Sequence, residues 1–339
     1  MLNEKIYKNI LSDNRLSYVL KSISALHVVK LHPQYINKDN SLIFLTKKAL
    51  KLPFSIIQFF FYLILNFIFV KKNKKIVKKE ILIISHLIEK KYLSQRKDFY
   101  FGDLEKIFYK KNKTFFKFLI NHTSYPSFFY NNSLGLKNKL VAEKILNPFL
   151  ELKIFFLKIF CIFELINLFQ KKFFNLFIFK KLIISLFDSE TTFALRIRFQ
   201  IINIIKKIEP REIILTYEGF SWEKICINGI KTVNEKIKCI GYQHTFLSKY
   251  HRGIYNIISK NYNPNTIWSS HKSSYRLLKK KINTDKVKIN FIGNLKNILV
   301  KKKNVQKNNK NIFLVLPEGS VGDCVELFNF SLKSSFINK

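Results

Sequence analysis

Arginine, cysteine, glycine and methionine are all scarce in this chain of 339 residues. Only seven of its 60 basic residues are arginine, although the formal net charge is +38. Nucleic-acid sites rely on arginine for bidentate contacts, with aromatic rings for stacking. Because arginine is rare and the aromatic residues lie in long apolar runs, we expect no nucleic-acid partner, and a charge-driven nucleic-acid binder is the weaker alternative. Lysine, asparagine, isoleucine and phenylalanine are abundant together, so part of the charge reflects a compositional bias.

The few cysteines exclude two common kinds of stabilisation. They lie far apart without a C-x-x-C pair, which predicts neither a zinc site nor a disulfide framework. We expect small buried side chains in a reducing compartment, no metal and no cofactor. Residues 1–30 lack a continuous apolar core before a small-residue cleavage site, so we expect no signal peptide and a cytoplasmic location. The cysteines are Cys161, Cys226, Cys239 and Cys324.

One long stretch carries no charge at all. Residues 52–70 read LPFSIIQFFFYLILNFIFV, and lysines lie on both sides of the run. A helix of this length spans about 28 Å, close to the hydrocarbon thickness of a bilayer. The stretch predicts a spanning, embedded or interfacial helix, and a buried core helix is the alternative.

A second apolar stretch, residues 152–187, includes polar positions at helical spacing. Glu164, Asn167, Lys171 and Asn175 predict a narrow polar stripe beside a very wide apolar face, with further lysines along the segment. This combination is typical of helices that lie in the interface of an anionic membrane. We therefore expect an anionic membrane surface as a partner and a peripheral or embedded position on the cytoplasmic side of the inner membrane. A helical hairpin packed on its own domain is the alternative.

Elsewhere the chain alternates short apolar runs with helical segments, which predicts an α/β fold. The runs are apolar throughout, as in parallel strands buried on both faces. Helices are expected at 223–235 and 273–281. The expected strands are 81–85, 116–120, 212–216, 238–242, 266–268 and 287–292.

We predict four regions along the chain. Residues 1–80 form a helical, membrane-associated region, and 81–300 a Rossmann-like lobe with an amphipathic helical insertion near 150–187. The polar, charged segment 301–311 is a linker by composition. Residues 312–339 then resemble the first strand, glycine turn and helix of a second Rossmann-like lobe. The sequence stops 28 residues into this lobe, so we expect it to be incomplete.

The candidate functional residues follow predicted strands, because ligands of open α/β sheets collect at the carboxyl ends of strands. One pair of candidate residues follows the expected strand 212–216, and a second pair follows 238–242. A basic aromatic loop comes directly after the second pair. A glycine turn follows the strand that begins after the linker. These candidates are Tyr217, Glu218, Gln243, His244, Lys249, Arg252, Glu318, Gly319, Ser320 and Gly322.

The order of several short motifs resembles a known group of proteins. Y-E-G-x-x-W-E-K begins at Tyr217, and it is followed by G-Y-Q-H, P-N-T-I-W, F-I-G-N and L-P-E-G. This order is similar to that of bacterial surface-carbohydrate proteins, which build capsule or O-antigen and share the two-lobed GT-B glycosyltransferase architecture. The resemblance covers roughly 81–332. It implies transfer of a sugar from a nucleotide-sugar donor, met by the second lobe, to a glycan or lipid-linked acceptor, met by the first.

Such a reaction needs a general base on the acceptor hydroxyl and positive or N–H groups on the leaving phosphate. Glu218 is the first candidate base because it follows directly after a strand, and a carboxylate that caps the next helix is the alternative. His244 is the second candidate, or a ligand contact, or simply a buried hydrogen-bonded histidine. Tyr217 and Gln243 are expected to line the binding site, and Glu223 to support it or cap its helix.

The remaining candidates would bind anionic groups. Lys249 and Arg252 hold an anion or are ordinary solvated charges. The turn of Gly319 to Gly322 offers backbone N–H groups to a phosphate, or is a plain strand-to-helix turn.

One departure from the family bears on activity. Relatives engage the nucleotide with a His-Pro pair in the second lobe, but the only such pair here is His32-Pro33, so that role is not transferred. A non-catalytic, membrane-associated scaffold or remnant in the same pathway is therefore the alternative to an active transferase.

Overall fold

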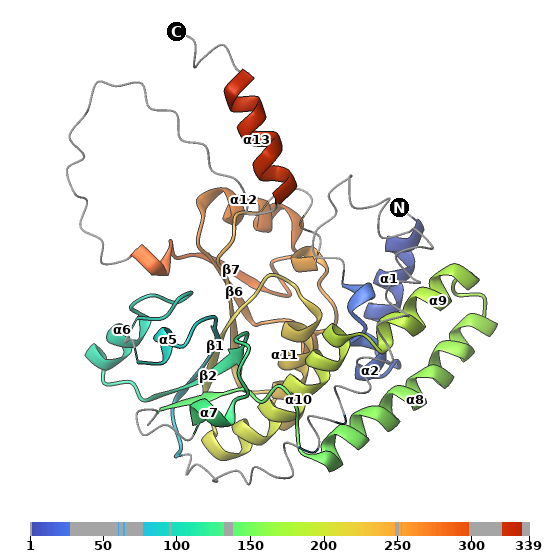
Figure 1. Ribbon diagram of the computed structural model, residues 1–339, viewed down its shortest axis with the longest axis horizontal. Helices are drawn as coiled ribbons and strands as arrows, with labels where there is room; N and C mark the ends of the chain where they lie inside the picture. The colour runs from blue at the N-terminus through green and yellow to red at the C-terminus, as the bar shows by residue number, and fades with distance from the viewer. Residues whose placement is uncertain are drawn as a thin grey trace. The chain divides into compact units, whose positions relative to one another are not determined.

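The computed structural model describes residues 2–27, 60, 64, 77–94, 97–131, 138–247, 251, 253–297 and 321–333. The chain divides into two units, Met1–Leu299 and Val300–Lys339. The first unit contains a β-sheet with helices around it (Figure 1). In the second, one helix is described, α13 (Val321–Lys333).

All the strands of the seven-stranded sheet run parallel, in the order β3-β2-β1-β4-β5-β6-β7. The order reverses between β1 and β4, as in doubly wound α/β sheets, where ligands bind outside the carboxyl ends of the strands at the reversal. The predicted α/β class is therefore confirmed. The strands are β1 (Ile81–Leu87), β2 (Phe115–Asn121), β3 (Lys139–Val141), β4 (Glu212–Thr216), β5 (Lys238–Gln243), β6 (Thr266–Ser269) and β7 (Lys288–Phe291).

The central strands are apolar throughout because both of their faces are covered. In β1, Leu82 and Ile84 belong to one buried cluster, while Ile81 and Ile83 belong to another on the opposite face. This alternation follows from the two-residue period of a strand. All six predicted strands are present, within one or two residues at their ends, and β3 was not predicted.

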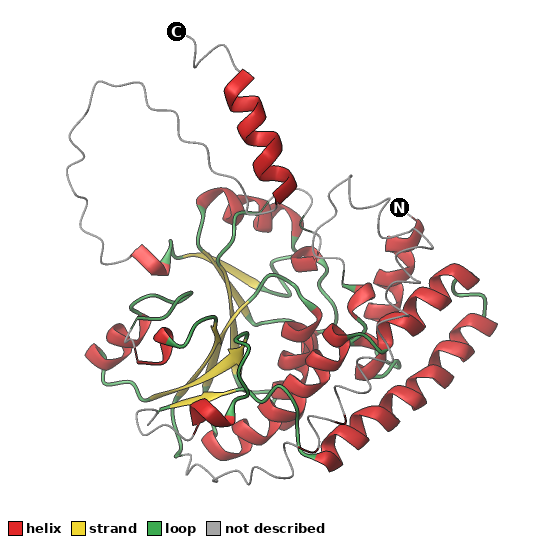
Figure 2. Cartoon of the chain, in the orientation of Figure 1, coloured by secondary structure: helices red, strands yellow, loops and turns green. Residues whose placement is uncertain are grey.

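Helices cover both faces of the sheet, as the red and yellow elements of Figure 2 show. On one face, α10 (Ser189–Ile208), α11 (Ser221–Val233) and α12 (Lys272–Lys281) contribute to the core cluster. On the other face, α6 (Leu104–Lys110) and η4 (Leu295–Asn297) contribute to the second buried cluster. The two predicted helices correspond to α11 and α12. Short helices elsewhere are α5 (Lys91–Ser94), α7 (Phe128–Asn131), η2 (Gly253–Tyr255) and η3 (Lys260–Tyr262).

A further helical layer packs against α10 on the side away from the sheet. It consists of the hairpin of α8 (Pro148–Gln170) and α9 (Leu176–Leu186), together with α1 (Leu2–Ser12), α2 (Tyr18–Lys21) and η1 (Ser24–Leu26). The stretch 152–187 is thus helical, and it does form a hairpin on its own domain.

The expected single polar stripe along 152–187 was wrong. The side chain of Asn175 caps α9 by accepting the backbone N–H of Ile178 at 2.9 Å, so the helix is interrupted before it. Glu164 faces inward and accepts hydrogen bonds from the backbone N–H and hydroxyl of Ser17. The four predicted polar positions therefore do not form one stripe.

Two of the predicted segments lie mainly outside the part of the chain that the structure describes. The stretch 52–70 lies outside the described residues except for Phe60 and Ile64, and so does the segment 301–320. Among the helices that are described, none combines the length and the hydrophobicity that crossing a membrane requires. Cys161, Cys226 and Cys239 are free and buried, as expected of small apolar side chains.

Candidate functional site

A hydrogen-bonded chain of side chains joins three strand ends where the strand order reverses. Nε2 of His86, near the end of β1, lies 2.7 Å from Oγ1 of Thr216, the last residue of β4. Nδ1 of the same ring lies 2.7 Å from Nε2 of His122, which directly follows β2. A Thr–His–His chain therefore lies at the edge of the sheet where doubly wound sheets bind ligands.

Both imidazoles of this chain are held in the neutral form. Burial lowers the pKa of His86 to about 3, and the neighbouring His122 and His244 add to the effect. Partial desolvation also lowers the pKa of His122, with a contribution from the charge of Lys144. A neutral ring donates with one nitrogen and accepts with the other.

Two hydrogen-bond patterns satisfy the Thr–His–His chain. In the first, His86 donates from Nε2 to Thr216 and accepts at Nδ1 from His122, which leaves Nδ1 of His122 as an acceptor. In the second, Thr216 donates to His86, His86 donates to His122, and Nδ1 of His122 carries the proton. Because His122 is exposed, its ring is the end of the chain that a ligand in solution can reach.

Aromatic rings surround the histidines. The ring of His86 lies 5.0 Å from that of Tyr100 and 5.5 Å from that of Trp222. Tyr100 in turn contacts His244, with 4.5 Å between ring centroids in an edge-to-face arrangement. The ammonium of Lys296 lies 5.3 Å from the centroid of Tyr100. Residues from six different segments thus form one patch of neutral imidazoles and aromatic rings, with the ammonium of Lys296 beside it.

A buried ionic network holds Tyr100 in place. The carboxylate of Asp98 accepts the backbone N–H of Tyr100 at 2.8 Å and the hydroxyl of Ser85 at 2.8 Å. Its second oxygen accepts the ammonium of Lys117 at 2.9 Å, and Lys117 also pairs with Glu105. Because Lys117 lies on β2 and Ser85 on β1, the turn that carries Tyr100 is fixed to the sheet.

Glu218, the first candidate base, is buried and heavily engaged. Its Oε1 accepts the backbone N–H groups of His244 at 3.0 Å and Thr245 at 3.1 Å, and its Oε2 accepts the Thr245 hydroxyl at 2.7 Å. Nδ1 of His244 lies 3.2 Å from the same Oε1. A general base needs a lone pair directed at the substrate. These contacts therefore favour Glu218 as the residue that positions His244 and the loop after β5.

Glu223 caps the helix that follows β4. Its carboxylate accepts the backbone N–H groups of Glu218, Gly219 and Phe220 at 2.9, 2.7 and 2.8 Å. These donors precede α11, which begins at Ser221. Of the two predicted roles of Glu223, supporting the site or capping its helix, the helix cap is confirmed.

His244, the second candidate base, belongs to the aromatic patch. Burial lowers its pKa to about 4, and the nearby Lys296 adds to the effect. The ring is half-buried against Tyr100, so it is neutral at neutral pH and close to the Thr–His–His chain. His244 thus remains a candidate for catalysis or ligand contact.

Tyr217 and Gln243 do not line a binding surface. Tyr217 is completely buried in the core cluster beneath the strand ends. Gln243 is also completely buried, donates to the carbonyl of Thr245 and accepts the hydroxyl of Ser269 at 3.0 Å, which ties β5 to β6. The predicted role in ligand contact is corrected to a structural one, because neither side chain reaches solvent.

The remaining predicted residues are not brought to this patch by the described structure. Lys249, Arg252, Glu318, Gly319 and Ser320 lie outside the described residues. Gly322 is described as the second residue of α13, within the helix, in the second unit. In the described part of the chain, no group of His, Cys, Asp or Glu side chains could hold a metal ion.

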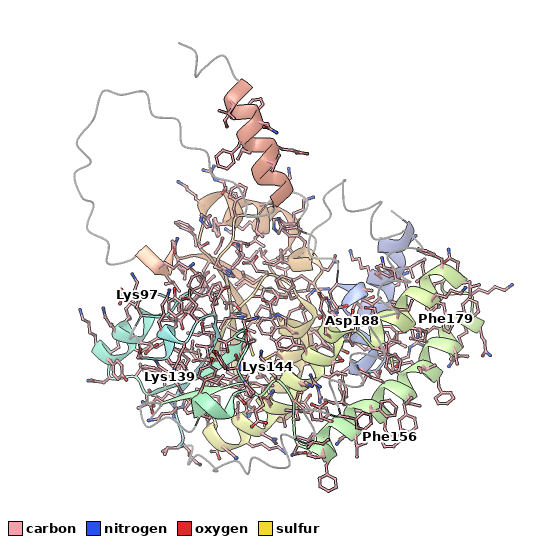
Figure 3. All side chains as sticks on the ribbon, viewed as in Figure 1. Lys97, Lys139, Lys144, Phe156, Phe179 and Asp188 are labelled. Atoms are coloured by element: carbon pink, nitrogen blue, oxygen red, sulfur yellow. The ribbon has the colours of Figure 1, made fainter. Side chains whose placement is uncertain are left out.

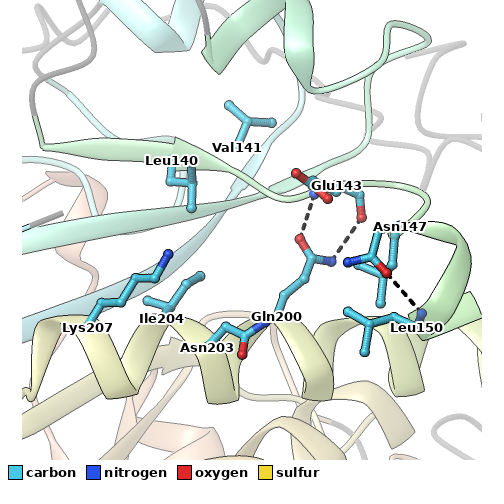
Figure 4. Close-up of a pocket in the computed structure, with 10 residues that line it drawn as sticks. Leu140, Val141, Glu143, Asn147, Leu150, Gln200, Asn203, Ile204 and Lys207 are labelled. Atoms are coloured by element: carbon cyan, nitrogen blue, oxygen red, sulfur yellow. Dashed lines mark hydrogen bonds between the residues drawn. The ribbon is translucent and has the colours of Figure 1, made fainter. Parts of the chain in front are cut away.

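A pocket of about 180 Å³ lies elsewhere, between β3, the segment after it and α10 (Figure 4). Glu143 and Gln200 are joined there by two hydrogen bonds, from Glu143 N to Gln200 Oε1 at 2.7 Å and from Gln200 Nε2 to Glu143 O at 2.9 Å. The pocket contains no predicted site residue and no histidine of the patch. Its lining is Leu140, Val141, Glu143, Leu146, Asn147, Leu150, Gln200, Asn203, Ile204 and Lys207.

Sequence reasoning missed His86, His122 and Tyr100. The predicted strands ended at residues 85 and 120, just before the two histidines. A usable signal was present, because both apolar runs are followed within two residues by a histidine. In a parallel sheet such positions meet at one edge.

No protein-family model, curated protein or solved structure matches the chain. The chemistry of the site therefore has to be inferred from its own residues.

Proposed function

We propose that this chain is a glycosyltransferase-like protein of bacterial surface polysaccharide biosynthesis, whose first unit is a Rossmann-like, acceptor-binding lobe of a GT-B architecture. The observation that carries the proposal is the Thr216–His86–His122 chain at the reversal of the strand order. The order of sequence motifs from Tyr217 onward supports it. The donor is a nucleotide sugar, and the acceptor is a glycan or a lipid-linked sugar.

The patch suits an uncharged, hydroxyl-rich ligand better than an anion. Neutral imidazoles both donate and accept hydrogen bonds, as sugar hydroxyls do. The rings of Tyr100 and Trp222 offer apolar faces for the C–H side of a sugar ring. Glu218 and Glu223, two of the carboxylates near this edge, are engaged by backbone N–H groups. The recognition chemistry is therefore that of an acceptor sugar.

In the proposed step, Nδ1 of His122 accepts the proton of the acceptor hydroxyl while that oxygen bonds to the anomeric carbon of the donor. The bond from the anomeric carbon to the donor phosphate breaks, and its electron pair leaves with the nucleotide phosphate. His86 and Thr216 fix the orientation of the His122 ring. A lowered pKa keeps this imidazole unprotonated and able to act as the base.

The test uses the intact protein with a panel of nucleotide sugars and lipid-linked glycan extracts. Nucleotide release that requires both donor and acceptor is the expected result. His122→Asn should lower this rate about 100-fold or more, the usual contribution of a general base. His271→Asn is the matched control, because His271 follows β6 at the same sheet edge and contacts Ser270 rather than the Thr–His–His chain.

A non-catalytic scaffold in the same pathway is the second candidate. The observation that favours it is that the carboxyl groups of Glu218 and Glu223 both accept backbone hydrogen bonds. Neither group is therefore free to act as the base. Calorimetry of the intact protein with each nucleotide sugar separates the two candidates. Absence of donor binding, together with unchanged pathway output for His122→Asn in cells, would support the scaffold and remove the transferase.

A further inference from the structure

The helix α8 is apolar on two opposite sides. Its inner side packs into the helical layer with Ile154, Cys161, Leu165 and Leu168. Its outer side bears a second row of large apolar residues. In Figure 3 the labelled Phe156 lies on this outer side, and aromatic side chains project outward along the helix. The outer row consists of Leu152, Phe155, Phe156, Phe160, Phe163 and Ile166.

These outer side chains are exposed to an unusual degree. Phe160 is 66% exposed, Phe163 63% and Phe156 55%. The row follows the helical spacing of three and four residues, so it forms one continuous strip. A helix that is apolar all round is ordinarily covered on every side, and a large exposed apolar patch marks an interaction site.

Exposed apolar side chains are also present in the turn after α8 and at the start of α9. Phe173 in the turn, and Leu176 and Phe177 in the first turn of α9, are also exposed. We call the outer row of α8 together with these three residues the α8–α9 face.

The charges beside the α8–α9 face are all of one sign. On α8, the turn and α9, the exposed charged residues are lysines. The acidic residues of α8 face inward: Glu151 accepts Nε of Arg196 at 2.8 Å, and Glu164 accepts the backbone N–H of Ser17 at 2.8 Å. The exposed lysines are Lys153, Lys171, Lys172 and Lys180.

We infer that the α8–α9 face docks on an anionic lipid bilayer, with its phenylalanines at the boundary of headgroups and acyl chains. Lysines beside an apolar strip extend their ammonium groups to the lipid phosphates while their stems stay in apolar contact. A second copy of the chain would instead bring two sets of lysines together without acidic partners, which opposes association.

The ion pair with Arg196 and the hydrogen bonds with Ser17 fix the hairpin to the rest of the unit. The face is therefore a preformed surface. Membrane binding does not depend on the transfer reaction, although it would hold the protein where lipid-linked acceptors lie.

The first test measures co-flotation of the intact protein with phosphatidylcholine vesicles, with and without phosphatidylglycerol. Phe160→Ser/Phe163→Ser should weaken binding about tenfold or more through lost apolar burial. The matched control is Tyr109→Ser/Phe246→Ser, which removes aromatic rings that are 61% and 63% exposed elsewhere on the unit. This control should bind like the wild type.

The second test asks whether the lysines beside the α8–α9 face attract the anionic headgroups, or whether only the net charge of the protein matters. Lys153→Gln/Lys171→Gln/Lys180→Gln should lose most of the preference for vesicles that contain phosphatidylglycerol. Replacing Lys279, Lys280 and Lys281 on α12 by Gln changes the net charge equally and should preserve that preference, because these lysines lie away from the hairpin.

Equal vesicle binding by the wild type and Phe160→Ser/Phe163→Ser would overturn the inference. So would sedimentation of a dimer that this variant dissociates, since a second copy would then cover the face. Circular dichroism of each variant checks folding. Both tests contain neither donor nor acceptor, so a negative result does not bear on the proposed function. In the same way, a loss of transfer activity does not bear on membrane binding.

Discussion

His86 and His122 come from neighbouring parallel strands, and their imidazoles are joined from Nδ1 to Nε2 over 2.7 Å. The register pairs His86 with Ile120, so His122, two residues further on, points to the same face of the sheet as His86. Side chains offset by two residues on adjacent strands are within reach when they are long or aromatic. Strand register alone thus brings the two rings together.

The His86 ring is expected to stay neutral in mildly acidic solution. Its pKa is lowered to about 3 by burial, so the imidazole nitrogen shifts should remain those of a neutral ring at about pH 5. Heteronuclear NMR of the folded protein measures this directly, and the chain unfolded in urea is the control, where histidines titrate near their ordinary value of about 6.5. A His86 midpoint near that ordinary value would contradict the assignment.

Replacing Glu218 by Gln should destabilise the protein by about 2 kcal/mol, because an NH2 group replaces one of the two oxygens that accept from His244 and Thr245. Urea denaturation measures the free energy of unfolding. Glu235→Gln is the control, since Glu235 is exposed, and it should change stability by less than about 0.5 kcal/mol. Equal values for the two variants would show that the Glu218 contacts contribute little.

Lys117→Met should cost about 3–5 kcal/mol of stability. The substitution leaves the buried carboxylates of Asp98 and Glu105 without their cation. Lys113→Met is the control, because the Lys113–Glu80 pair is exposed and such pairs contribute about 1 kcal/mol or less. If thermal unfolding of both variants occurs at the same temperature, the buried network is not what holds the Tyr100 turn.

The protein should lose stability as the pH falls below the ordinary histidine range. Burial lowers the pKa of His27 to about 3, and the charge of Lys224 adds to this, so the folded state favours the neutral ring. The contribution is complete above about pH 6.5 and decreases as the pH falls toward the folded value. At about pH 5 the loss is about 2 kcal/mol from this residue.

The variant His27→Gln tests this linkage. The Gln amide can donate to the carbonyl of Lys21, as Nε2 of His27 can at 2.6 Å, but it does not titrate. Urea denaturation at about pH 7.5 and about pH 5 should therefore show a smaller difference for the variant than for the wild type. Identical differences would mean that His27 does not contribute to the pH dependence.

Gly219→Ala should be more damaging than Gly293→Ala, although both glycines have a positive φ, of 89° and 80°. A Cβ at Gly219 would lie 2.2 Å from the backbone of Gly253, whereas a Cβ at Gly293 meets nothing within 4 Å. We expect a loss of about 3 kcal/mol or more for the first, and about 1–2 kcal/mol of backbone strain for the second. Comparable losses would mean that the close approach to Gly253 relaxes easily.

The strands were predictable because burial on both faces makes them continuous apolar runs. The strand β3 was not, since its three residues include Lys139 and only two apolar side chains. Strand ends were also uncertain by one or two residues. That small error removed His86 from its strand and concealed the most informative pair in the molecule.

The order and register of the strands could not be obtained from the sequence. Glu218 and His244 were predicted as alternative bases because both follow strands, and the structure brings them together. Their hydrogen bonds, and the complete burial of Tyr217 and Gln243, depend on how β4, β5 and β6 align. The same holds for Lys117 and Lys224, which composition counts as surface charge and which the fold buries.

The carboxylate of Glu223 has a consequence for the kinds of ligand that this sheet edge accepts. In dinucleotide-binding sheets a phosphate lies at the start of a helix that follows a strand, held by backbone N–H groups. At the start of α11 those N–H groups, from Glu218, Gly219 and Phe220, already hold the side chain of the chain's own Glu223. A phosphate could enter there only by displacing this side chain, whose pKa burial and the neighbouring Glu218 raise well above its ordinary value.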